Sequence, residues 1–207
     1  MYTKLNNISD LPKASLLKKI SQSLATLDAI MMPDWDFRYF SFNNRWDYSE
    51  SMASMRDGSG DEYFILFNDT GVIGKVFSKE TEFSTEKKLK SLSKNIPKVF
   101  SSFFKEPAFT LENTSFLFFS EKKSTLWNSS PIDRKLPLLG FLSENNHIDV
   151  YLKFSEEYYE KKLDERAVNK IFSHTPLDED LIQSINKNSS MDIILNDIKE
   201  IGYPLKS

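Results

Sequence analysis

The sequence of 207 residues contains no cysteine, and it has only two histidines and six glycines. Without cysteine there are no disulfide bonds, thiolate zinc sites, iron–sulfur clusters or cysteine nucleophiles. Residues 1–13 lack the apolar stretch of a secretory signal, and no window approaches about eighteen consecutive apolar residues. We therefore expect a cytoplasmic protein that neither enters nor crosses a membrane.

Glycine is also too sparse for the familiar phosphate-binding loops, which need several glycines so that backbone N–H groups can approach an anion. Neither G-x-x-x-x-G-K-[ST] nor G-x-G-x-x-G occurs in the sequence. These absences make nucleotide hydrolysis and dinucleotide binding improbable, and we expect no cofactor.

Arginine is scarce as well, and the net charge is −3 with a pI of about 5.5. Nucleic-acid-binding proteins usually carry a basic, arginine-rich face. The lysines between Lys87 and Lys94 are balanced by nearby glutamates and are typical of a solvated helix face. We therefore expect no nucleic-acid partner.

Aromatic residues are abundant, with 17 Phe, 8 Tyr and 3 Trp, which is ample material for a core of large side chains. The patterns predict an α+β fold with an N-terminal helix, an antiparallel β meander and a C-terminal cluster of three to four helices. We expect a single domain over residues 1–207, rich in sheet over 34–145 and helical over 146–207.

The N-terminal helix is predicted from apolar residues at three- and four-residue spacing, with Asp10 as its cap, Pro12 in its first turn and Pro33 beyond its end. A strand follows near residues 37–42. Residues 50–80 then read as a meander, because the turns DGSGD and NDTG carry residues that tolerate positive φ.

The middle of the chain is less regular. A helix interrupted by Pro97 is plausible between Ser84 and Lys105, but the sequence leaves the fold of residues 84–113 open. Strands are predicted over 115–121 and over 138–142, with an exposed loop around Pro131 between them.

Four helices are predicted in the last third of the chain. Residues 148–163 place aromatic and leucine side chains on one face, and a short helix follows at residues 167–172. The next helix is predicted to have Thr175 as its cap and Pro176 in first position. The last begins near Ser190 and ends at Gly202.

Candidate catalytic groups are few. His147 and His174 precede predicted helices without a neighbouring nucleophile motif, so a structural role is favoured and no catalytic residue is assigned. The segment RDGSGDE, from Arg56 to Glu62, superficially resembles a calcium loop, but the sixth and twelfth places hold Glu62 and Asn68. A hairpin tip is favoured and no metal site is assigned.

The most unusual local chemistry lies between Trp35 and Asp61. Trp, Tyr and Arg dominate binding hot spots because they combine large contact area with a directed polar tip. The alternative is that the aromatics are core and the charges pair with one another. The candidate partner-binding residues are Trp35, Arg38, Arg45, Trp46, Asp47, Arg56 and Asp57.

Three stretches resemble a widespread family of uncharacterised bacterial proteins. They are FSFNNRWDYSESMASMRDGSGDEYFILFNDTGVIGKVF, FSEEYYEKKLDERAVNKIFSHTPLDEDLIQSIN and DIKEIGYP, and the resemblance spans residues 27–204. It implies a bacterial origin and one integrated architecture. It carries no activity, substrate or catalytic residue over to this chain.

Three functions remain open. The favoured hypothesis is a non-catalytic module that binds another protein, such as a toxin-neutralising (immunity-type) or regulatory protein. The alternative is a small hydrolase-like enzyme with scattered His, Asp, Glu and Arg residues, and the third possibility is an assembly component. The sequence gives no oligomeric state.

Overall fold

The computed structural model describes residues 4–79, 86–131, 136 and 138–206. The strands are β1 (Phe40–Asp47), β2 (Glu50–Arg56), β3 (Glu62–Asn68), β4 (Gly71–Phe77), β5 (Phe116–Glu121) and β6 (Asn128–Ser129). The α-helices are α1 (Ala14–Met31), α2 (Glu86–Ser93), α3 (His147–Tyr158), α4 (Glu165–Phe172), α5 (Glu179–Ile185) and α6 (Met191–Ile201). Short 3₁₀ helices occupy Ile8–Asp10, Trp35–Phe37, Lys98–Phe100, Phe103–Lys105, Pro107–Phe109 and Leu139–Leu142.

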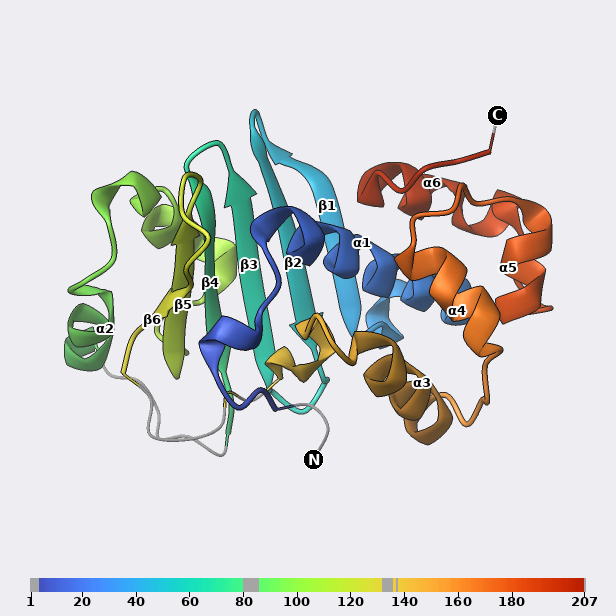
Figure 1. The fold of residues 1–207 in the computed structure, drawn as a ribbon, viewed down its shortest axis with the longest axis horizontal. Coiled ribbons are helices and arrows are strands. Elements are labelled where there is room, and N and C mark those ends of the chain that lie inside the picture. Colours follow the sequence, from blue (N-terminus) through green and yellow to red (C-terminus); the bar gives the residue numbers. More distant parts are fainter. Residues whose placement is uncertain (1–3, 80–85, 132–135, 137, 207) are drawn as a thin grey trace.

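The strands form one antiparallel sheet in the order β1-β2-β3-β4-β5-β6, so the predicted meander and the α+β class are confirmed. α1 lies across one face of the sheet, and the C-terminal helices α3–α6 gather beyond β1 (Figure 1). Sequence order and spatial order coincide, with tight turns joining β1 to β4 and a long connection that includes α2 and three 3₁₀ helices between β4 and β5.

The turn between β3 and β4 shows how the predicted turn residues act. Asn68 Oδ1 accepts the backbone N–H groups of Thr70 and Gly71 at 2.9 and 3.2 Å. Gly71 has φ of +145°, and a Cβ placed there would lie 2.2 Å from the carbonyl oxygen of Ser120. Only glycine fits, because this conformation and this close approach both exclude a side chain.

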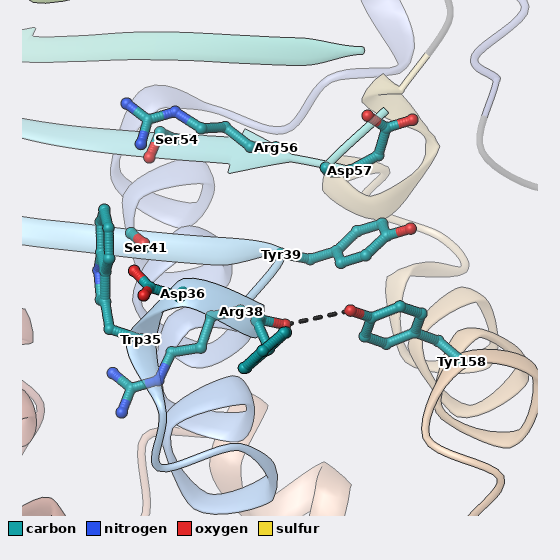
Figure 2. Close-up of a pocket in the computed structure, with 11 residues that line it drawn as sticks. Trp35, Asp36, Arg38, Tyr39, Ser41, Ser54, Arg56, Asp57 and Tyr158 are labelled. Atoms are coloured by element: carbon teal, nitrogen blue, oxygen red, sulfur yellow. Dashed lines mark hydrogen bonds between the residues drawn. The ribbon is translucent and has the colours of Figure 1, made fainter. Parts of the chain in front are cut away.

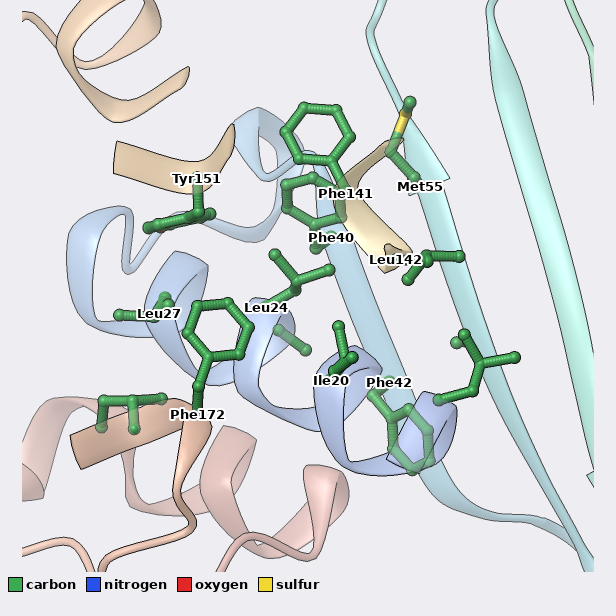
Figure 3. Close-up of a cluster of buried hydrophobic side chains, with 14 of the residues drawn as sticks. Ile20, Leu24, Leu27, Phe40, Phe42, Met55, Phe141, Leu142, Tyr151 and Phe172 are labelled. Carbon is green, nitrogen blue, oxygen red and sulfur yellow. The ribbon is translucent and has the colours of Figure 1, made fainter. Parts of the chain in front are cut away.

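The larger core lies between α1, the C-terminal helices and one face of the sheet. Ile20, Leu24 and Leu27 of α1 lie opposite Phe40, Phe42 and Met55 of β1 and β2 (Figure 3). Phe141, Leu142, Tyr151 and Phe172 close this core from the C-terminal side. Each large apolar side chain buried here contributes about 2 kcal/mol, so α1 is fixed mainly by packing.

The opposite face of the sheet carries a smaller, phenylalanine-rich core. Phe100, Phe103 and Phe109 are fully buried against Phe64 and Leu117 of the sheet. They belong to consecutive 3₁₀ helices over residues 98–109, in place of one long helix. Pro97 stands before the first of them, so the predicted interruption at this proline is confirmed.

A buried carboxylate joins α1 to β1 and α3. Asp28 Oδ2 accepts the backbone N–H groups of Tyr39 and Phe40, each at 2.9 Å, and its Oδ1 accepts the Tyr151 hydroxyl at 3.1 Å. Burial raises the pKa of Asp28 to about 6, against the opposing effect of these hydrogen bonds. The carboxylate thus satisfies two amides at the start of β1.

A buried cation holds the smaller core to the sheet. Lys75 Nζ lies 2.7 Å from Glu62 Oε1 and also donates to the carbonyl oxygens of Thr110 and Asn113 at 3.1 and 2.9 Å. Burial lowers the pKa of Lys75, and the Glu62 carboxylate opposes that shift. The ammonium group thereby fixes residues 110–113 over β3 and β4.

The outer edge of β1 is covered by α6. Arg38 donates to Asp197 Oδ2 at 2.9 Å, and Asn43 Nδ2 donates to Glu200 Oε1 at 3.2 Å. A Cβ on Gly202, which ends α6 with φ of +70°, would meet the side chain of Asn44 at 2.7 Å. The predicted glycine stop is therefore also a packing point between α6 and β1.

Two predictions of elements are wrong. Residues 139–142 form a 3₁₀ helix and not a strand, because Leu138 takes a left-handed φ of 65° and turns the apolar run under the larger core. The helix predicted over 148–163 ends at Tyr158, where Glu160 has φ of 55° and the N–H of Lys161 returns to the carbonyl of Ser155.

Two predicted caps are also wrong. Asp10 does not cap α1, because its carboxylate accepts the N–H of Asn7 and the backbone of Lys13 stands at the N-cap instead. α5 is capped by Asp178 and not by Thr175, since Leu177 pairs with the C-terminal segment through Pro204 and delays the helix. The loop expected around Pro131 lies mostly outside the described residues.

Candidate functional site

A cavity of about 380 Å³ opens on the sheet face that carries the smaller core, at the end of β1 and β2 (Figure 2). No residue of 98–109 lines this cavity. The cavity is lined by Trp35, Asp36, Phe37, Arg38, Tyr39, Ser41, Ser54, Arg56, Asp57, Gly58 and Tyr158. Its volume is in the range of pockets that hold a small ligand or the side chains of a partner protein.

One wall is the 3₁₀ turn Trp35–Phe37, held in place by Arg38. The Arg38 guanidinium donates to the carbonyl oxygens of Met32 and Pro33, both at 2.6 Å, and to Asp197. Its side chain is only 5% exposed, so this predicted binding residue has a positioning role. The turn it fixes leaves Trp35 and Phe37 56% and 59% exposed.

The floor of the cavity is polar, and its side chains form no hydrogen bonds or ion pairs with other described residues. Ser41 and Ser54 lie between the Trp35 ring and the Arg56 guanidinium (Figure 2). Ser54 is buried, yet its hydroxyl forms no hydrogen bond within the described part of the chain. The guanidinium carbon of Arg56 lies 5.0 Å from the centre of the Phe64 ring, and Arg56 forms no ion pair with any described residue.

The rim opposite Trp35 is formed by two tyrosines. Tyr39 and Tyr158 rings lie 4.5 Å apart, and the Tyr158 hydroxyl donates to the carbonyl of Phe37 at 3.2 Å (Figure 2). Burial first, and then the charge of Asp57, raises the pKa of Tyr39 to about 12. Both rings therefore present neutral phenols at neutral pH.

The same rim borders a second cavity of about 370 Å³, which shares Tyr39, Asp57 and Tyr158 with the first. Asp61 and Glu157 add two further carboxylates to its lining. The two cavities adjoin at this shared rim, and we refer to them together as the Trp35 groove, defined by the lining residues of both.

The hairpin tip at Asp57 is a turn. Asp57 Oδ1 accepts the N–H groups of Ser59, Gly60 and Asp61 at 2.8 to 2.9 Å. Asp61 in turn accepts the N–H of Lys79 at 2.8 Å and the Ser78 hydroxyl at 3.0 Å. These carboxylates organise their own loop, and no group of three metal-ligating side chains is found among the described residues.

The structure brings four of the seven candidate residues together and separates the other three. Trp35, Arg38, Arg56 and Asp57 line the Trp35 groove. Trp46 instead stacks on Phe109 with 6.1 Å between ring centres, as part of the smaller core. Arg45 and Asp47 lie at another cavity, near the β1–β2 turn.

Sequence reasoning missed Phe37, Tyr158 and the two serines of the floor. Tyr158 belongs to a run that is typical of an inward-facing helical stripe, yet it is 41% exposed at the end of α3. Serine carries no signal of its own in such a pattern. The site can be distinguished from the core only in the folded structure, where its aromatic side chains are exposed.

The two histidines lie outside this groove. His147 Nδ1 lies 2.7 Å from the carbonyl oxygen of Ser143, and His174 Nε2 lies 3.0 Å from that of Lys19. Burial lowers the pKa of both imidazoles. Their rings pack on Phe172 and Tyr203, so each fastens a helix end to the larger core.

Comparison with protein-family models, with curated proteins and with solved structures gave no match. A search of the described residues finds no helix that is both long enough and apolar enough to span a bilayer.

Proposed function

We propose that this protein is a non-catalytic protein-binding module, of the toxin-neutralising (immunity-type) or regulatory kind, and that the Trp35 groove is its binding surface. The observation that supports this proposal is the pair of large aromatic side chains, Trp35 and Phe37, which are more than half exposed on a turn fixed by Arg38. A rigid turn loses little entropy when its aromatic side chains insert into a partner.

The charge of the groove favours a basic partner. Its lining includes four carboxylates, Asp36, Asp57, Asp61 and Glu157. Arg38 is paired with Asp197, which leaves Arg56 as the one lining cation without an ion pair among the described residues. The net charge of −3 adds a weak long-range attraction for a basic surface.

The test is affinity capture from bacterial lysate with wild-type protein and with Trp35→Ala. We expect a basic protein to bind the wild type reproducibly and to be lost with Trp35→Ala, because removal of a hot-spot tryptophan costs 2 kcal/mol or more, roughly 30-fold in affinity. Raised salt should slow association. The purified pair is then measured by calorimetry.

Tyr48→Ala is the matched control. Tyr48 is fully exposed at the β1–β2 turn, away from the Trp35 groove, so its removal should leave binding unchanged. If wild type, Trp35→Ala and Tyr48→Ala retain the same proteins, or if the wild type retains none, the proposal is wrong.

The hydrolase-like alternative predicts a histidine in a cavity with carboxylates. Neither His147 nor His174 lines the Trp35 groove, and both imidazoles are engaged with backbone carbonyls. No contact among the described residues favours catalysis over binding.

A further inference from the structure

A separate cavity of about 360 Å³ lies at the end of the sheet that carries the β1–β2 and β3–β4 turns. The first turn of α1 points toward this end of the sheet (Figure 1). Ala14, Ser15 and Lys18 of α1 line the cavity, together with Arg45, Ser51 and Lys122.

The start of α1 leaves its amides without partners. Lys13 at the N-cap gives no side-chain hydrogen bond, and the first turn contains no acidic residue. The N–H groups of Ala14 and Ser15 donate to no group in the described chain. Free N–H groups and the positive end of the helix dipole favour an anion at this place.

Ser51 supplies an independent sign of a ligand. It lies on β2 beneath α1, it is only 3% exposed, and its side chain lines this cavity. Its hydroxyl forms no hydrogen bond with any described residue and opens onto the cavity. It can therefore donate to a ligand oxygen there.

The cavity carries three cations and three carboxylates, and one of each forms an ion pair with the other. Asp69 lies 3.4 Å from Lys122, Glu50 accepts Asn68 Nδ2 at 3.1 Å, and Asp47 accepts the N–H of Tyr48 at 2.7 Å. Lys18 and Arg45 form no ion pair within the described chain.

Lys18 is the cation placed for this role, one helical turn after Ala14. Its Nζ lies 5.9 Å from the centre of the Phe42 ring, and burial lowers its pKa. A partly buried ammonium without a carboxylate gains from an anion beside it.

We infer that the free N–H groups of Ala14 and Ser15, the Lys18 ammonium and the Ser51 hydroxyl form a binding site for a phosphate-type oxyanion. All four are hydrogen-bond donors of residues that line one cavity, and a tetrahedral oxyanion offers an acceptor oxygen to each. This site is independent of the Trp35 groove and of the function proposed for it.

The test is a titration with inorganic phosphate followed by amide resonances in NMR, at constant ionic strength. We expect saturable shifts at Ala14 and Ser15, and no such shifts with chloride or acetate. Lys18→Gln and Ser51→Ala should each weaken phosphate binding about tenfold, which corresponds to the loss of one charge-assisted contact.

Lys19→Gln is the matched control, since Lys19 is exposed on the same helix and does not line the cavity. Its affinity for phosphate should equal that of the wild type. Wild-type spectra without saturable shifts, equal weakening by Lys18→Gln and Lys19→Gln, or equal shifts with chloride would each overturn the inference.

Free phosphate and a phosphate ester offer the same oxyanion. Titration with phenyl phosphate distinguishes them: tighter binding than inorganic phosphate indicates an ester whose organic group occupies the rest of the cavity, and equal binding indicates the free ion. Either result supports the oxyanion site.

Discussion

Each face of the sheet buries a charged side chain, and the two charges are satisfied in different ways. Asp28, under the larger core, is held by two amides and a tyrosine hydroxyl, all of them neutral donors. Lys75, under the smaller core, is held by the Glu62 carboxylate together with backbone carbonyls. The Asp28 charge is stabilised by neutral hydrogen-bond donors, and the Lys75 charge is stabilised by an ion pair.

The difference shows how each buried charge is compensated. Desolvation without a cation raises the pKa of Asp28 to about 6, so its ionised form is disfavoured in the folded state. Burial also lowers the pKa of Lys75, and the Glu62 carboxylate, whose side chain is 18% exposed, opposes that shift. The larger core therefore carries the group with a pKa of about 6, close to neutral pH.

The largest expected effect is that of Asp28→Ala. The substitution leaves a buried amide, a part-buried amide and the Tyr151 hydroxyl without an acceptor, and we expect the free energy of unfolding to fall by about 4 kcal/mol. Urea unfolding followed by tryptophan fluorescence measures it. Asp36→Ala, at an exposed aspartate, is the control. A loss below about 1 kcal/mol would show that the carboxylate does not hold β1.

The pH dependence of stability isolates the charge itself. Because the folded pKa of Asp28 is raised to about 6 from its ordinary value of 3.8, its contribution is complete below pH 4 and is lost as the pH rises through about 6. The loss amounts to about 3 kcal/mol.

Asp28→Asn keeps an acceptor oxygen but does not titrate. The difference between wild-type and Asp28→Asn unfolding free energies should therefore change between pH 4 and pH 6.5 and stay constant above that range. A difference that is flat across the whole range would mean that Asp28 is not destabilised by burial.

Lys75→Met tests the ion-paired side. The carbonyl oxygens of Thr110 and Asn113 lose their donor while Glu62 regains water, so we expect a loss of about 2 kcal/mol and faster amide exchange over residues 110–113. Lys122→Met, which removes an exposed pair with Asp69, should cost less than about 0.5 kcal/mol. Equal losses for both variants would contradict the structural role of Lys75.

The smallest effect concerns one neutral donor of Asp28. Tyr151→Phe removes a hydroxyl that lies 3.1 Å from Asp28 Oδ1, and we expect a loss of about 1 kcal/mol. Since this hydroxyl lowers the pKa of Asp28, the variant should raise that pKa further, which carboxyl ¹³C shifts can follow. An unchanged titration would mean that the Tyr151 hydroxyl does not contribute to the pKa of Asp28.

The sheet could be predicted from the sequence because its turns are determined by the residue types of the turns themselves. Gly71 and Asn68 fix the β3–β4 turn through positive φ and a side-chain hydrogen bond, and both requirements are visible in the residues NDTG. The run at residues 138–142 carries no such signal. Short apolar runs fit a strand and a buried helical turn equally well, and Leu138 decides between them only through its tertiary packing.

Only part of the candidate site could be predicted, for a similar reason. Trp35 and Arg56 are conspicuous by residue type, and both line the Trp35 groove. Arg45 and Trp46 looked equivalent in the sequence. They lie further along β1 than Ser41, in the part of the strand where the register between Asn43 and Asp47 is irregular, and a bulge of this kind has no reliable sequence signature.

The covering of β1 by α6 limits how the sheet can associate. An exposed edge strand offers free amides and carbonyls on which another chain can build, in a regulated complex or in an aggregate. Here the carboxylates of Asp197 and Glu200 and the close packing of Gly202 occupy that border. A second chain therefore cannot extend the sheet at β1. Any partner that binds beside this strand must be recognised through the shape and charge of side chains.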